Sequence, residues 1–86
     1  SFTLSPNYPN PFNPETVISY SLPVDCQVNL EVYNITGERV ATLVNQRQRA
    51  GDHTVTWDAG GMASGVYLCW LRAGGFSQTR KMILLR

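Results

Sequence analysis

Few residues of this chain have the types and spacing that catalysis or ligand binding requires. The single histidine, His53, follows Asp52 within a predicted strand. Consecutive side chains of a strand point to opposite faces, so these two cannot form an acid–base pair. The six carboxylates are scattered and match no calcium-loop pattern. Gly60-Gly61 lacks the Lys-Ser/Thr pair of a phosphate loop, and no helix is predicted after it. We therefore expect a protein that is not an enzyme and that uses no metal or other cofactor.

Two cysteines, Cys26 and Cys69, could form a disulfide or remain as buried thiols. Their spacing fits neither a CxxC redox pair nor a zinc site, which would need more ligands. A disulfide between them would stabilise a small exported domain by roughly 4 kcal/mol in the chain-entropy model. Free cysteine, however, packs as a small apolar side chain in many cores. Both alternatives stay open at the level of the sequence.

Trp70 is the aromatic residue that we expect to be the most exposed. It lies on the opposite face of its predicted strand from Tyr67 and Leu71, and it stands beside Arg72. An exposed ring can stack on a sugar, so Trp70 is a candidate for ligand stacking and a carbohydrate is a minor candidate ligand. For most of the other aromatic residues we expect a place in the core.

Charge and hydropathy exclude two classes of partner. The formal net charge of +1 argues against a general nucleic-acid or membrane-surface binder. No apolar run approaches the ~20 residues of a membrane helix, and the chain does not open with a signal peptide. If the protein is secreted, we expect this chain to be part of a longer precursor.

All charged residues after position 58 are basic, and this part of the chain could meet an acidic partner.

The hydrophobic pattern predicts strands and no helix. Residues 27–33 alternate strictly, with Val28, Leu30 and Val32 on the core face, and a turn over residues 34–37 makes a hairpin with residues 38–44. We expect a polar loop over residues 45–51. The further expected strands are 16–22, 52–58, 66–71, which we expect to be a central strand covered on both faces, and 76–85. The predicted fold is all-β: an antiparallel immunoglobulin- or fibronectin-III-like sandwich of about seven strands.

The segment Asn7 to Pro14 predicts a stiff extended arm. Four of the five prolines lie between Pro6 and Pro14, which excludes a helix and an ordinary paired strand. Tyr8 and Phe12 lie inside this segment, and we expect both to anchor the arm on the domain, with Phe12 the more buried. We accordingly divide the chain into an arm and linker junction, residues 1–15, and a sandwich, residues 16–86.

The last strand is apolar on both faces at its end. Ile83 and Leu85 fall on one face, and Met82 and Leu84 fall on the other. Ends of chains usually fray into solvent. We therefore expect this strand to be buried in the sandwich, covered by the arm, or recognised by a partner.

The order of these motifs resembles one known family. The motifs are the Asn7-to-Pro14 segment, Thr16-x-Ile18-x-Tyr20-x-Leu22-Pro23, Val28-x-Leu30-x-Val32-Tyr33-Asn34-x-x-Gly37, Ala50-Gly51-x-His53-x-Val55-x-Trp57-Asp58, Ser64-Gly65-Val66-Tyr67, and Lys81 to Arg86. They resemble the type A C-terminal sorting domain of the type IX (Por) secretion system, which is related to the immunoglobulin-like domain of flagellar hook-capping proteins. The resemblance covers nearly the whole chain.

The resemblance implies a signal domain of an exported protein from Bacteroidota-like bacteria. Such a domain follows an N-terminal cargo domain and is recognised in the periplasm by the outer-membrane translocon. Many such domains are then cut off by a sortase-like peptidase, and the cargo is released or attached to anionic lipopolysaccharide. By position, the recognition residues would be Gly65, Val66 and Tyr67, together with Lys81, Met82, Ile83, Leu84, Leu85 and Arg86. We expect recognition by strand addition to the edge of the final strand.

Two features depart from the family pattern. Cys26 and Cys69 are not part of it, and Trp70 stands where a basic or polar residue is commoner. A second interpretation is therefore an accessory module that binds carbohydrate or stabilises an attached secreted enzyme. A third is an interaction module of a larger extracellular assembly.

Overall fold

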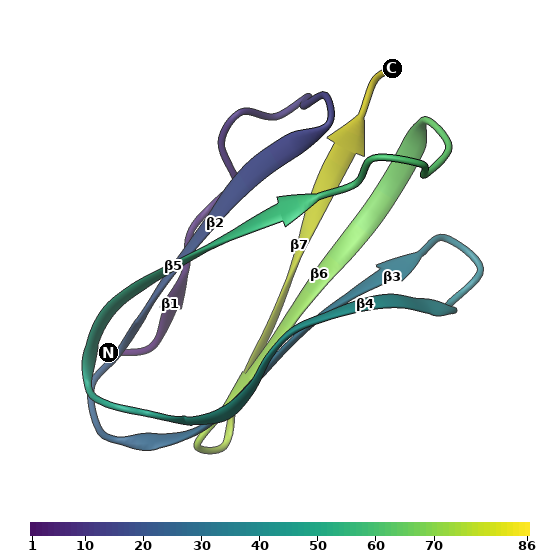
Figure 1. Cartoon of the computed structure of the whole chain (residues 1–86). Helices are drawn as coiled ribbons and strands as arrows, with labels where there is room; N and C mark the ends of the chain where they lie inside the picture. The colour runs from purple at the N-terminus through teal and green to yellow at the C-terminus, as the bar shows by residue number, and fades with distance from the viewer.

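The computed structural model describes residues 1–86 and contains seven strands in two layers. The strands are β1 (Thr3–Leu4), β2 (Glu15–Leu22), β3 (Cys26–Asn34), β4 (Arg39–Gln48), β5 (Gly51–Asp58), β6 (Gly65–Ala73) and β7 (Phe76–Leu84). One sheet has the order β1-β2-β5 and the other the order β4-β3-β6-β7, and all strand pairs are antiparallel. Figure 1 shows the two sheets as facing layers. The predicted seven-stranded sandwich is confirmed. It has no helix long and apolar enough to cross a bilayer.

The core lies between the two sheets and follows the period of two most clearly in β2, β6 and the first half of β3. Val28, Leu30 and Val32 are fully buried, as the alternation predicts. An aromatic cluster closes one end of the core, where the ring of Trp57 lies 5.7 Å from that of Phe12 and 5.5 Å from that of Tyr67. Such tilted and edge-on contacts between aromatic rings are favourable beyond the area that they bury.

The hairpin of β3 and β4 forms at the predicted turn. The side-chain Oδ1 of Asn34 accepts hydrogen bonds from the backbone N–H groups of Thr36 (3.1 Å) and Glu38 (2.9 Å). Gly37 has a φ of +88°, which a residue with a side chain adopts only with strain. These two residues explain why the chain reverses here.

Two details of the predicted strands are wrong. Residues 45–48 continue β4 and pair with β3, so the expected polar loop shrinks to the short crossing between the sheets before Gly51. This segment lies on an edge strand, where its polar side chains face solvent. Their polarity resembles that of a loop, but it only indicates that the strand is exposed. The sequence predicts that the central strand β6 is covered on both faces. Its inward side chains are buried, but its outward side chains are half-exposed, so only the inner face is covered.

Residues 1–15 are mostly exposed and pack on the sandwich at a few points. Strand β1 pairs with β2, and Leu4 is buried in the core. Phe12 is 2% exposed, as expected of an anchor. The expectation for Tyr8 is wrong: its side chain is 80% exposed, and the residue is held only through backbone hydrogen bonds of 3.0 and 2.9 Å to Val17. A bridge to β2 points its ring away from the core.

Candidate functional site

The final strand β7 separates its side chains into a buried and an outward set. Met82 and Leu84 are fully buried between the sheets. Lys81 is exposed, Ile83 is half-buried, and Leu85, just past the strand, is 56% exposed. Only this second set can touch a partner while the domain stays folded.

The arm closes the outer edge of β7 near its end. The N–H of Phe12 donates to the carbonyl of Ile83 (2.9 Å), and the N–H of Leu85 donates to the carbonyl of Phe12 (3.0 Å), which makes a parallel bridge. The side-chain amide of Asn10 supplies a second pair, accepting from the N–H of Ile83 (2.9 Å) and donating to the carbonyl of Lys81 (3.4 Å). The arm thus occupies backbone groups that an added strand would need.

Arg86 fastens the chain end to a connector. Its N–H donates to Ser64 Oγ (2.9 Å), and its guanidinium donates to the carbonyls of Ala59 (3.4 Å) and Met62 (3.1 Å). These bonds hold the segment between β5 and β6 against the end of β7. The structure therefore gives Arg86 a role within the fold.

The segment Gly65-Val66-Tyr67 opens β6 beside the end of β7. Tyr67 is 7% exposed, and its hydroxyl donates to the carbonyl of Ala63 (2.7 Å). Val66 is half-buried on the outer face, opposite Ile83 in the register. The ring of Tyr67 is thus a core residue, and Val66 lies beside the outward set of β7.

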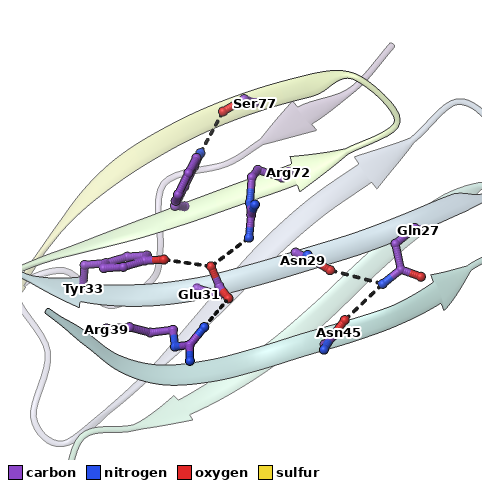
Figure 2. A network of polar contacts seen from close by, with 9 residues as sticks. Gln27, Asn29, Glu31, Tyr33, Arg39, Asn45, Arg72 and Ser77 are labelled. Carbon is purple, nitrogen blue, oxygen red and sulfur yellow. Dashed lines mark hydrogen bonds and ion pairs between the residues drawn. The ribbon is translucent and has the colours of Figure 1, made fainter. Parts of the chain in front are cut away.

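The outer face of the four-stranded sheet carries a buried carboxylate. Glu31 is 6% exposed and binds Arg39 (3.2 Å), Arg72 (3.0 Å) and the hydroxyl of Tyr33 (2.9 Å), as Figure 2 shows. Burial raises the pKa of Glu31, but the hydrogen bonds from Tyr33 and Arg39 and the charge of Arg72 outweigh it and leave the pKa below its usual 4.5. Glu31 therefore stays ionised and neutralises part of this basic face.

The replacement Glu31→Gln should flatten the pH dependence of stability. A carboxyl whose pKa is lowered in the folded state stabilises it above the pKa of the unfolded chain, and this contribution is lost as the pH falls through the folded value. We therefore expect the difference between the unfolding free energies of the wild type and the variant to shrink as the pH falls below about 5. Urea titrations followed by circular dichroism measure this. Glu15→Gln removes an exposed carboxylate without an ion pair and is the control. Parallel curves for the wild type and Glu31→Gln would contradict the assignment.

Trp70 lies beside this network and is half-buried. The expectation that it is the most exposed aromatic residue is wrong, because the side chain of Tyr8 is 80% exposed. The guanidinium of Arg72 lies 4.5 Å from the centroid of the Trp70 ring. The indole Nε1 of Trp70 donates a hydrogen bond to Ser77 Oγ (2.7 Å). Next to it is a hollow of about 250 Å³, whose lining includes Tyr33, Ile35, Leu68, Trp70 and Thr79. The sequence singled out Trp70 but not this hollow, because Tyr33 and Ile35 come from a different hairpin.

Comparison with known families shows what kind of domain this is. A family model described as "Secretion system C-terminal sorting domain" matches residues 7–85. The chain belongs to this family. No curated protein and no solved structure matches it.

Membership places the sorting domain in type IX secretion and implies a protein that is exported across the outer membrane to the cell surface or the medium. Of the residues carried over by position, the structure brings Val66, Lys81 and Ile83 onto the outer face of the β6–β7 pair and leaves Leu85 exposed just past the end of β7. It does not bring Tyr67, Met82 or Leu84 there, because their side chains fill the core.

Both cysteines of the sorting domain are free and buried, so the disulfide alternative is wrong. Cys69 pairs with Val32 across β3 and β6, and Cys26 lies six positions further along β3. At about 3.3 Å per residue this separates the cysteines by roughly 20 Å, whereas a disulfide needs Cα atoms within about 7 Å. Burial raises the pKa of Cys69 to about 12, which makes it an unreactive thiol.

Proposed function

We propose that the chain is a non-catalytic type A signal that directs an attached N-terminal cargo domain through the outer-membrane translocon of type IX secretion. In this proposal the junction with the cargo lies within residues 1–15, and a sortase-like peptidase removes the domain afterwards. The observation that carries the proposal is the family match over residues 7–85. The outward surface at the end of β7 supports it, since it presents side chains of the terminal motif.

The arm closes the edge of β7 around Ile83, and at this end of the strand it favours recognition through side chains over strand addition. Phe12 and Asn10 satisfy the outward backbone groups around Ile83, and releasing the arm would pull the buried Phe12 out of the core. Fully exposing such a side chain costs roughly 1.5–3 kcal/mol. Lys81 and Leu85, by contrast, are accessible in the folded domain. We therefore propose these outward side chains, with Ile83 and Val66, as the part that the translocon contacts.

The double replacement Lys81→Glu with Leu85→Asp tests the proposal. In a host with the secretion system, we expect it to lower the ratio of extracellular to periplasmic cargo by about tenfold or more, the effect of losing an interface hot spot. Point changes are sharper than deletion of Lys81 to Arg86, which would also remove the core residues Met82 and Leu84. Immunoblots of the two fractions measure the ratio.

Two controls make the result decisive. Val24→Asp places a charge on a 54% exposed apolar residue of another loop and should leave export unchanged. The thermal unfolding midpoint of each variant shows that the domain is still folded. Normal export of a folded Lys81→Glu, Leu85→Asp protein would refute the proposed function.

A further inference from the structure

We propose that the hollow beside Trp70 receives one large apolar side chain of a protein partner, and that a carboxylate next to that side chain pairs with Lys81. This inference rests on the proposed function and names the chemistry of the contact. The partner would be an acidic segment with a leucine or an aromatic residue.

The hollow is continuous with the outward surface of β7. In the register, Tyr33 of β3 lies opposite Leu68 of β6, and Leu68 lies opposite Lys81 of β7. Trp70 lies opposite Thr79 in the same pair of strands. A partner that touches Lys81 therefore meets the lining of the hollow on the neighbouring strand.

The lining is apolar where a solvent-exposed face would be expected to be polar. Ile35 lies at the tip of the hairpin turn with 74% of its surface exposed, and Leu68 is only half-buried. Exposed apolar residues that gather in one place mark sites of protein interaction, whereas single ones do not. Here Ile35, Leu68, Ile83 and Leu85 all lie on or next to one sheet face.

The size of the hollow favours a single side chain over a sugar chain. Its volume of about 250 Å³ is below the range of roughly 300–1,000 Å³ that is usual for sites of small molecules. Arg72 also covers one region of the Trp70 ring, so the ring does not offer a free platform to a sugar on that side.

The charges of the face favour an acidic partner. Both oxygens of the Glu31 carboxylate are engaged by Arg39, Arg72 and Tyr33. The other acid near the rim, Glu38, has only neutral side-chain donors, Asn34 (2.9 Å) and Thr36 (3.3 Å), so its charge is not compensated there. The cations of this face, Arg39, Arg72 and Lys81, nevertheless outnumber its two carboxylates. Lys81 is exposed and has no carboxylate within ion-pair distance. An incoming carboxylate would therefore find Lys81 unpaired.

Filling the hollow from within tests the inference. Thr79 is exposed and lies opposite Trp70, so Thr79→Trp adds a ring to the hollow without removing a core contact. We expect the ratio of extracellular to periplasmic cargo to fall by about tenfold or more, since a buried apolar side chain contributes at least that factor to binding. Thr54→Trp, at an exposed position of β5 in the other sheet, is the matched control and should leave the ratio unchanged.

A second variant tests the rim, and a binding measurement tests the competing ligand. Ile35→Asp should lower export, and Ile35→Leu should preserve it. The cargo-bearing protein is also run in gels that contain soluble xylan. Retardation by xylan that Thr79→Trp abolishes, together with normal export of that variant, would make the hollow a carbohydrate site and overturn the inference.

The outcomes separate this inference from the proposed function. If Lys81→Glu with Leu85→Asp blocks export while folded Thr79→Trp and Ile35→Asp proteins are exported normally, the hollow has no role and the proposed function stands. If all of these variants are exported normally, the proposed function fails and the inference fails with it. Loss of export in Thr79→Trp and Ile35→Asp, with intact folding and an unaffected Thr54→Trp control, supports the inference.

Discussion

The replacement Leu84→Ala should destabilise the domain by about 2–5 kcal/mol, because it leaves a cavity in a core that cannot fully close around it. Leu84 is fully buried on the inner face of β7, between the two sheets. Small domains bury a lower fraction of their surface than large ones and are correspondingly marginal. A loss of this size is therefore a large part of the total stability, and we expect part of the protein to be unfolded at 37 °C.

The neighbouring residue is the matched control. Leu85→Ala truncates a side chain that is 56% exposed and keeps the backbone bond to Phe12, so we expect a change within about 0.5 kcal/mol. Urea unfolding followed by fluorescence of Trp57 and Trp70 gives both values. Equal destabilisation by the two replacements would show that the inward and outward sets of β7 are assigned wrongly. The pair also separates loss of folding from loss of recognition in any export assay.

The replacement Phe12→Ala should cost about 3–5 kcal/mol, the range for removing an aromatic side chain from a core. Phe12 is 2% exposed and packs against Trp57, and its backbone closes the edge of β7 at Ile83 and Leu85. Losing the ring should therefore loosen the arm as well as the core. We expect the amide of Leu85, which donates to Phe12, to exchange its hydrogen faster than in the wild type.

Tyr8→Ala serves as the control within the same arm. The ring of Tyr8 is 80% exposed, so the replacement should change stability by less than about 0.5 kcal/mol and leave amide exchange at Leu85 unaltered. Denaturant titration and hydrogen exchange followed by NMR measure the two effects. Unchanged exchange at Leu85 in Phe12→Ala would show that the arm is not what protects this edge.

Much of the fold could be predicted from the sequence because its information is local. The alternation in residues 27–33 placed Val28, Leu30 and Val32 in the core, where they lie. Asn34 and Gly37 marked the hairpin turn through their own backbone preferences. The order of the motifs along the chain indicated the sorting-domain family, which the match over residues 7–85 shows.

The candidate site was predicted only in part, because its accessibility depends on contacts between distant residues. Asn10 bonds to Ile83 across 73 positions, and nothing in either segment indicates the pairing. Arg72 likewise donates to the buried Glu31 from 41 positions away. The exposure of the Tyr8 ring and the separation of the two cysteines likewise depend on which strand each segment pairs with.

The sequence alone determined the inner face of β3, the turn after it and the kinship of the domain, since these follow from side-chain type and spacing along one segment. Only the tertiary structure decided which half of the Lys81-to-Arg86 motif is accessible. Packing between the sheets buries Met82 and Leu84, and docking of the arm closes the backbone edge at Ile83 and Leu85. The surface that remains, with Lys81 and Ile83 of β7 near the hollow at Trp70, exists because β3 pairs with the hairpin of β6 and β7, from which it is distant in the chain.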